Sequence, residues 1–484
     1  MVAFRRHARR GRHSQRHRRR PRHPPAVKPD PNPPLPGPGN VPDDWSLRDA
    51  ALEIVRRLRE AGYEALLAGG CVRDLLRGVA PKDYDIATSA HPAEIQALFP
   101  RSDAVGAHFG VILVKSRGHG FEVATFREDG DYRDGRRPEQ VTFSTPEADA
   151  RRRDFTINGM FYDPLEDRVI DHVGGREDLA AGLIRAIGEP SDRFREDYLR
   201  LLRAIRFATH LGFAIEPVTW AALCENASRI AAITPERIRE ELDKIWLSPA
   251  RVRGFDLLVE SGLMAAVLPE ILALRGCEQP PEWHPEGDVF VHTRLMMEQL
   301  PPGASLPLVL SVLFHDIGKP ATFTRDDADG RIRFHGHDQV GATMTKDILR
   351  RLRYPNAVID TVTAAVARHM RFKDVQGMRT ATLKRFMAAP HFADELELHR
   401  VDCLGSNGKL ENHAFVLARQ REFADAPLLP SWFLSGRDLL DHGVAAGPDL
   451  GTILTEAHDL QLDGAHTSRE EALAWLEGRV GDGG

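Results

Sequence analysis

The hydrophobic pattern divides the first part of the chain into a helix and several short strands. Apolar residues recur at helical spacing through 45–61 and the pattern ends at Gly62, which predicts an amphipathic helix. The apolar run 65–67 predicts a buried strand, and the pair Gly69-Gly70 ends it before a helix that we expect to begin near Val72. The apolar runs 110–114 and 121–126 predict two more strands.

Beyond these strands the pattern becomes helical. Residues 127–138 combine arginines, acids and glycine and predict a mobile polar loop, whereas 163–178 closes an α/β unit. The spacing is wholly helical from 192 to about 274 and helical again, now with many histidines, from about 289. We therefore expect an α+β chain with a tail over 1–44, an α/β head over 45–180, an all-helical neck over 181–275, a helical body over 276–420 and a helical C-terminal tail over 421–484.

Composition qualifies this picture at the N-terminus. Residues 1–23 hold ten arginines and no acid, and 24–42 are rich in proline, so 1–44 is predicted to be disordered. The segment is either a non-specific RNA anchor or an inert tail created by a mistaken start codon. Without the ten arginines of 1–23 the net charge of −5 becomes about −15, so the body needs a local basic stripe if it binds RNA.

The cysteines and the apolar runs bear on location. Four widely spaced cysteines without a Cys-x-x-Cys pair favour a reducing compartment, and we expect a cytoplasmic protein. No apolar run is long enough to span a bilayer, and the N-terminus lacks the apolar core of a secretory signal, so no membrane partner is expected.

The glycine pair and two following aspartates carry the first chemical signal. A strand–Gly-Gly–helix turn lets backbone approach a phosphate, and Arg73 can add a fork of donors. Asp83 and Asp85, two residues apart on a predicted strand, would point to one face and hold a divalent cation beside a triphosphate. Either feature alone is common in other contexts. Together they outline a site for nucleotidyl transfer, with Glu122 as a minor candidate for a third carboxylate.

A second signal is a basic stripe in the neck. On one helix over 195–207, Arg200, Arg203 and Arg206 lie opposite the apolar face, and Asp197 lies beside the first of them. An exposed helix with spaced arginines is common, but it does not explain why an Asp-x-x-Arg pair opens the stripe. The sequence therefore predicts the local basic surface that the acidic body requires.

The histidine-rich body predicts a second metal site. A His-Asp pair follows an apolar helix, with a histidine upstream and an aspartate far downstream, a mixture that suits a divalent transition metal. A lone helical histidine is more often a packing residue, so the prediction rests on the combination. The segment resembles the HD phosphohydrolases, and the resemblance implies the ligands His292, His315, Asp316 and Asp402, with His337 and His369 for a second ion and Asp394 as an alternative to Asp402.

These motifs, in this order, resemble the class II tRNA nucleotidyltransferase and bacterial poly(A) polymerase family, with a C-terminal domain resembling the HD phosphohydrolases. The resemblance covers about 45–410 and rests on Gly-Gly-x-Val-Arg-Asp, Asp-x-Asp, Arg-Arg-Asp-Phe-Thr-Ile-Asn, Glu-Asp-x-x-Arg and the HD histidines. It implies a polymerase beta-like nucleotidyltransferase head. The roles it implies are catalysis and Mg²⁺ binding by Asp83 and Asp85, nucleotide binding by Gly70, Arg73, Arg153, Asp154, Asp197, Arg200, Arg203 and Arg206, and HD metal binding by His292, His315, Asp316 and Asp402.

The resemblance also implies the reaction. We expect template-independent addition of C and A to the 3′ end of tRNA from CTP and ATP, with Asp197 and Arg200 contacting the Watson–Crick edge of the base and Arg206 contacting phosphate or tRNA. The segment 127–138 resembles the family's flexible loop and argues against an enzyme limited to C addition. Poly(A) synthesis, addition of A alone, an HD phosphohydrolase as the main activity and an RNA-binding protein with an inactive head stay open. The sequence does not set the oligomeric state.

Overall fold

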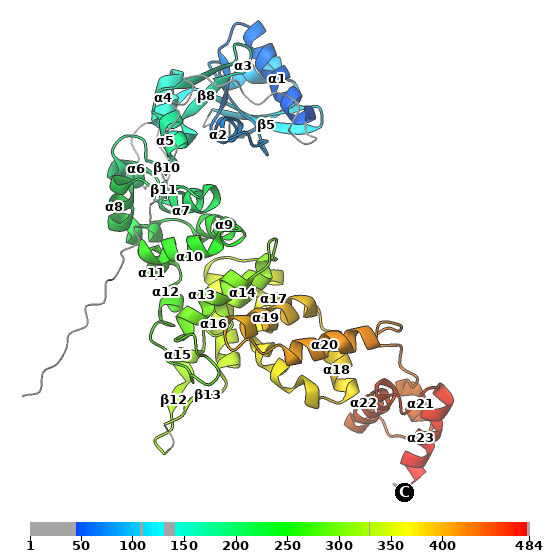
Figure 1. Ribbon diagram of the computed structural model, residues 1–484. Helices are drawn as coiled ribbons and strands as arrows, with labels where there is room; N and C mark the ends of the chain where they lie inside the picture. The colour runs from blue at the N-terminus through cyan, green and yellow to red at the C-terminus, as the bar shows by residue number, and fades with distance from the viewer. Residues whose placement is uncertain (1–44, 107–109, 130–140, 329, 482–484) are drawn as a thin grey trace, which may run out of the picture.

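The computed structural model describes residues 45–106, 110–129, 141–328 and 330–481. Figure 1 shows a series of units that follow one another in chain order, from the head with its sheet to a small helical unit at the C-terminus. The predicted tail over 1–44 and most of the predicted loop over 127–138 lie outside the described residues. Within them, no helix has both the length and the apolar character needed to cross a membrane.

The head is an α+β unit built on a mixed sheet. Its strand order is β3-β4-β5-β2-β1-β8-β9, and β6 and β7 form a separate hairpin. Its elements are α1 (Trp45–Glu60), β1 (Ala65–Ala68), α2 (Gly70–Leu76), β2 (Asp85–Thr88), α3 (Pro92–Leu98), β3 (Ser102–Gly106), β4 (Val111–Ser116), β5 (His119–Thr125), β6 (Arg127–Asp129), β7 (Val141–Phe143), α4 (Pro146–Arg151), the 3₁₀ helix η3 (Thr156–Asn158), β8 (Met160–Asp163), β9 (Arg168–Asp171) and α5 (Gly175–Ala181).

The register of the central strands places the two sequence motifs side by side. All four residues of β1 are buried, as the apolar run predicts, and β1 pairs antiparallel with β2 so that Ala68 lies opposite Asp85. The Gly69-Gly70 turn therefore leaves the sheet beside Asp85. The helix after the turn begins at Gly70, two residues earlier than expected. Asp83 is not on the strand, because β2 begins only at Asp85.

The neck is helical apart from a short parallel strand pair that links it to the end of the head. We expected helix alone, but two-residue strands carry no periodicity that a sequence pattern can detect. The elements are β10 (Leu183–Ile184), α6 (Pro190–Glu196), α7 (Leu199–Leu211), β11 (Ala214–Ile215), α8 (Pro217–Asn226), the 3₁₀ helix η4 (Ala227–Ala232), α9 (Pro235–Trp246), α10 (Arg251–Glu260), α11 (Leu263–Val267) and α12 (Pro269–Leu272).

The body is a helical unit with one β-hairpin, and it shares its core with the neck. One continuous cluster of buried apolar side chains runs from Phe155 to Val401, so neck and body are not separated by solvent. The elements are α13 (Val289–Gln299), α14 (Leu306–Phe314), α15 (Lys319–Thr322), β12 (Phe323–Arg325), β13 (Ile332–Phe334), α16 (His337–Arg351), α17 (Asn356–Arg368), the 3₁₀ helix η5 (His369–Gly377), α18 (Thr380–Met387), α19 (Phe392–Gly405) and α20 (Glu411–Glu422).

The C-terminal unit is a small bundle with its own core. It consists of α21 (Gly436–Asp441), α22 (Pro448–Asp463) and α23 (Arg469–Gly481), which agrees with the helical tail expected over 421–484. Polar contacts fix α22 to α18 of the body: Asp463 accepts from the backbone N–H of Ala381 at 2.6 Å, and Lys384 donates to the Leu462 carbonyl at 2.9 Å.

Candidate functional site

A cavity of about 490 Å³ lies where the head meets the neck. It is lined by residues from four sequence motifs that are far apart in the chain. All the residues predicted for the nucleotide site line the cavity, and Gly69, Arg152, Asn158, Leu199, Phe207 and Arg237 line it in addition. The lining comprises Gly69, Gly70, Arg73, Asp83, Asp85, Arg152, Arg153, Asp154, Asn158, Asp197, Leu199, Arg200, Arg203, Arg206, Phe207 and Arg237.

The glycine turn allows close approach of other groups to the backbone. Gly69 has φ +74°, and a Cβ there would lie 2.9 Å from Nη1 of Arg153, so neither the backbone conformation nor the space suits a side chain. Arg73 follows on α2 and donates to Oδ1 of Asn158 at 2.8 Å. The turn and the guanidinium therefore face the cavity together, an arrangement that suits a phosphate chain.

The carboxylates across the turn repel one another. Burial, together with the charges of Asp83 and Glu122, raises the pKa of Asp85 to about 6, while Arg153 opposes this shift. Glu122 lies on β5, which pairs parallel with β2, so it contributes to the field at Asp85 without lining the cavity. A divalent cation would relieve this repulsion, and the oxygen donors are the type that Mg²⁺ prefers. The donor set therefore fits a hard divalent ion.

A buried ion-pair network holds the Arg-Arg-Asp-Phe-Thr-Ile-Asn motif in place. Asp154 is 7% exposed, and its Oδ2 accepts from Nε of Arg203 at 2.8 Å, so the head and neck meet through this pair. Although burial opposes ionisation, the Arg203 charge and the hydrogen bond from Asn158 lower the pKa of Asp154 to about 2. Asp149, which the sequence analysis missed, is buried and accepts from both Arg152 and Arg153.

The Asp-x-x-Arg pair does not lie on one helix as we expected. α6 ends at Glu196 and α7 begins at Leu199, with Asp197 extended between them and its Oδ1 accepting from the Leu199 N–H at 3.0 Å. Two amphipathic helices that meet end to end preserve the periodicity of one helix, so the pattern conceals the break. The partner of Asp197 is Arg237 on α9, at 2.8 Å.

The predicted basic stripe is also not an open surface. Arg200 is 9% exposed and donates to the Arg193 and Arg152 carbonyls at 2.9 and 3.1 Å. Arg206 donates to Glu241 at 2.6 Å. The side of α7 away from the core of the neck faces the head cavity, so its arginines line a pocket rather than a solvated stripe.

The ring of Phe207 contacts three of these arginines. It is 6% exposed and lines the cavity. The guanidinium carbons of Arg73, Arg203 and Arg206 lie 5.4, 5.4 and 4.1 Å from its ring centre. The negative face of the ring attracts each cation, and Arg73 belongs to the head whereas the others belong to the neck.

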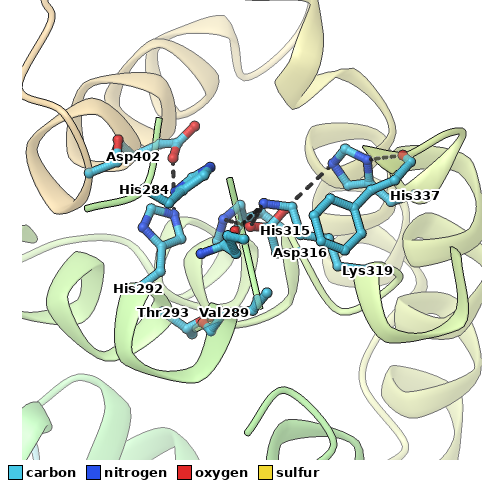
Figure 2. A network of polar contacts seen from close by, with 12 residues as sticks. His284, Val289, His292, Thr293, His315, Asp316, Lys319, His337 and Asp402 are labelled. Atoms are coloured by element: carbon cyan, nitrogen blue, oxygen red, sulfur yellow. Dashed lines mark hydrogen bonds and ion pairs between the residues drawn. The ribbon is translucent and has the colours of Figure 1, made fainter. Parts of the chain in front are cut away.

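A second polar centre lies in the body, beside a cavity of about 520 Å³. Figure 2 shows His315 and Asp316 at its middle, with His292 and Asp402 on one side and His337 on the other. Two groups of side chains here could each hold a metal ion, because the ligand atoms within a group lie within 4.8 Å of one another. One group is His292, His315 and Asp316, and the other is Asp316, His337 and His369. Asp316 belongs to both groups, and its Oδ1 lies 3.5 Å from His337 Nε2 and 3.7 Å from His369 Nε2.

The hydrogen bonds of this centre leave nitrogen atoms without partners. The buried Nε2 atoms of His292 and His315 lie 3.1 Å from Asp402 and Asp316 oxygens, but neither makes a hydrogen bond. Burial alone would lower the pKa of His292, yet Asp402 and Glu286 raise it to about 9, which reflects a field that attracts cations. Imidazole nitrogens mixed with carboxylates fit a divalent transition metal.

The structure also separates the alternatives left by the sequence. Asp402, near the end of α19, lies at the cluster, whereas Asp394 near its start accepts from Ser305 at 2.8 Å. Two residues that sequence reasoning missed also lie here: Lys319 donates to Asp316 at 2.7 Å, and Glu286 contacts His292. Both lie close in sequence to predicted ligands, but neither follows a spacing that indicates a site.

Comparison with known proteins finds three domain families that match successive segments of the chain. Residues 65–185 match the poly A polymerase head domain, 212–274 match the probable RNA and SrmB-binding site of polymerase A, and 288–399 match the HD domain. Over 216 residues the chain is 46% identical to a CCA-adding enzyme of Geobacillus stearothermophilus, covering 44% of this chain and 53% of that enzyme. The chain thus spans about half the length of the curated relatives it matches.

Solved structures extend the likeness over most of the chain. A Bacillus stearothermophilus CCA-adding enzyme in complex with CTP is 29% identical, with a TM-score of 0.68 and coverage of 89% of this chain and 97% of that one. A Thermotoga maritima CCA-adding enzyme complexed with tRNA has a TM-score of 0.60 at 19% identity, covering 90% of this chain and 96% of that one, and shares the fold. The chain is therefore similar to the CCA-adding enzymes over most of its length, and its segments match a poly A polymerase head domain, a probable RNA-binding domain and an HD domain in that order.

Proposed function

We propose that this chain adds C and A to the 3′ end of tRNA, using CTP and ATP without a nucleic-acid template. The observation that carries the proposal is the single cavity that joins the Asp83 and Asp85 carboxylates, the glycine turn and the Asp197 and Arg200 side chains. The relatives named as CCA-adding enzymes favour CCA addition over poly(A) synthesis or addition of A alone.

In the proposed reaction, the residues divide into three tasks. Asp83 and Asp85 would hold Mg²⁺, which supplies Lewis acidity for attack of the RNA 3′-hydroxyl on the α-phosphate. Gly70 and Arg73 hold the triphosphate, and Arg153 with Asp154 holds the ribose and a phosphate. Because the backbone of Gly69-Gly70 and the Arg73 guanidinium face the same cavity, the leaving pyrophosphate keeps its hydrogen-bond donors as the bond breaks.

Base selection falls to Asp197 and Arg200. A carboxylate accepts from the exocyclic amine of C or A, and a guanidinium donates to the adjacent ring nitrogen, whereas U and G present a donor at that position. In the structure both side chains are already bonded, Asp197 to Arg237, and Arg200 to Glu196 and to backbone carbonyls. Binding of a base therefore requires that these partners share or exchange their hydrogen bonds.

The test supplies purified protein with tRNA lacking CCA, tRNA ending in CC, and an unstructured RNA, each with one nucleotide at a time. We expect C addition to the first RNA, A addition to the second and little addition to the third. Addition of A to every RNA would instead indicate a poly(A) polymerase. The Asp83→Ala variant should lose all incorporation, and retained incorporation would contradict the assignment of the head.

A second activity, metal-dependent phosphohydrolysis at the HD centre, is favoured by the buried Nε2 atoms of His292 and His315, which make no hydrogen bond and lie 3.1 Å from carboxylate oxygens of Asp402 and Asp316. We expect a divalent transition metal there to support hydrolysis of bis(p-nitrophenyl) phosphate or p-nitrophenyl phosphate. The His315→Asn variant should lose this hydrolysis while it keeps nucleotide addition, and Asp83→Ala should show the opposite. Loss of both activities in either variant would contradict two separate sites. With four free cysteines, we also place the protein in the reducing cytoplasm.

A further inference from the structure

The loop over 278–288, between α12 and α13, covers one side of the HD centre. Its Glu286 side chain is 8% exposed, and Oε1 lies 2.8 Å from Nδ1 of His292. The same oxygen lies 2.9 Å from Nδ1 of His284, which lines the cavity. The other oxygen, Oε2, is buried without a hydrogen-bond partner. A buried carboxylate is costly, and here it faces two imidazoles rather than an arginine or lysine.

His292 differs from the other histidines of the centre in what holds its ring. In the other three, Nδ1 contacts a backbone carbonyl three residues earlier at 2.7–2.8 Å, which leaves Nε2 directed to the cluster: His315 to Val312, His337 to Phe334 and His369 to Val366. Nδ1 of His292 has only a longer hydrogen bond to a backbone carbonyl, that of Gly405 at 3.3 Å. Its contact with Glu286 Oε1, at 2.8 Å, is shorter.

We propose that Glu286 is a positioning residue for the HD metal centre. Its carboxylate accepts a hydrogen bond from Nδ1–H of His292 and so holds Nε2 of that ring toward Asp402 and His315. This proposal rests on the metal centre proposed above. A carboxylate behind a ligating imidazole fixes its tautomer and ring orientation and makes the ligand more basic, and loss of such a partner typically weakens metal binding about 10- to 100-fold. His292 is the ligand with most to lose, because no short backbone hydrogen bond holds its ring.

The loop has a second polar contact on this side of the centre. Gln279 in the same loop accepts from Lys319 at 2.6 Å, and Lys319 in turn donates to Asp316. The loop thus contacts His292 directly through Glu286 and is linked to Asp316 only through Lys319. Removing Glu286 leaves the Gln279 contact in place, so the expected effect is on His292 rather than on the whole loop.

The experiment measures Mn²⁺ binding to full-length protein stripped with EDTA, by calorimetry and by loss of the free-ion EPR signal. All variants carry Asp83→Ala, so that ions in the head do not contribute. We expect Glu286→Ala to weaken Mn²⁺ binding 10- to 100-fold, and Glu286→Gln, whose amide oxygen can still accept from Nδ1, to lie between it and the parent. The matched control is Glu282→Ala, an exposed carboxylate in the same loop.

The outcomes distinguish failure of the positioning role of Glu286 from failure of the proposed HD metal centre. If the Asp83→Ala parent and its His315→Asn derivative bind Mn²⁺ equally, the HD metal centre itself is wrong. If the parent binds through His315 and Glu286→Ala binds equally well, the positioning role is wrong. Equal weakening by Glu282→Ala would also overturn it, because the effect would then belong to the charge of the loop. Nucleotide addition by Glu286→Ala in the chain with Asp83 intact checks that the variant is folded.

Discussion

Gly318, at the turn between α14 and α15, offers a direct test of how tightly the HD centre is built. A Cβ at this position would lie 2.3 Å from the backbone oxygen of His337 and 2.6 Å from the backbone nitrogen of Gly341. Both atoms belong to α16, so no side-chain rotation relieves the contact. For Gly318→Ala, α16 must withdraw by at least about 0.7 Å, and overpacking of this kind destabilises a protein by about 1–3 kcal/mol.

The same displacement acts on metal binding. His337 is the first residue of α16, and its Nε2 lies 3.5 Å from Asp316 Oδ1. Metal–ligand distances tolerate changes of only about 0.2 Å, so the withdrawal should disrupt the group of Asp316, His337 and His369. We expect Mn²⁺ binding in the Asp83→Ala chain to weaken at least about tenfold and the midpoint of urea unfolding to fall.

The control for Gly318→Ala is Gly377→Ala, since a Cβ there meets nothing within 4 Å and the backbone φ is not positive. Urea unfolding followed by circular dichroism gives the stability change, and Mn²⁺ titration gives the affinity. Should Gly318→Ala match both the parent and the control in stability and in Mn²⁺ affinity, the contact of α16 with this turn would not constrain the centre.

Three further predictions concern the head and neck. The pKa of Asp154 is about 2 in the folded chain and about 3.9 in the unfolded chain, a difference that contributes about 2 kcal/mol of stability. This stability is present above pH 4 and is lost as the pH falls toward 2. Urea unfolding between pH 2 and 6 should show the loss in the parent and not in Asp154→Asn. Phe207→Leu removes the ring face from three arginines and should raise the KM for nucleotides about fivefold with a smaller change in kcat, whereas Phe207→Tyr should restore it; an unchanged KM would contradict the role. Arg237→Met leaves Asp197 without its ion partner and should increase incorporation of U and G in single-nucleotide assays, while Arg229→Met, which removes an exposed neck arginine, should not.

The sequence predicted the parts of the site that depend on local pattern. An apolar run followed by Gly69-Gly70 has few structural solutions, so the buried strand and the turn beside Asp85 followed directly. The resemblance to the HD phosphohydrolases named histidines and aspartates that the structure brings close together, and their role as metal ligands stays a prediction. The helical wheel placed Arg200, Arg203 and Arg206 on one side of the helix, and in the structure all three line the cavity.

What the sequence did not predict depends on contacts between units. A helical wheel shows which side of α7 avoids its own core, but not that the head covers that side and makes it a pocket. Arg237 and Glu286 act through side chains that are distant in sequence or lie in an irregular loop, where no periodicity applies. The break at Asp197 escaped detection because the apolar residues of α6 and α7 continue one pattern across it.

The continuous core from Phe155 to Val401 has a thermodynamic consequence. Because neck and body bury one set of apolar side chains, they should unfold as one cooperative unit, whereas the C-terminal bundle has a core of its own. Any ion that binds only the folded HD centre then raises the melting temperature of α7 as well, by mass action. Even a chain whose HD centre had lost its chemistry would still need this body as the scaffold that keeps α7, the helix that lines the head cavity, folded.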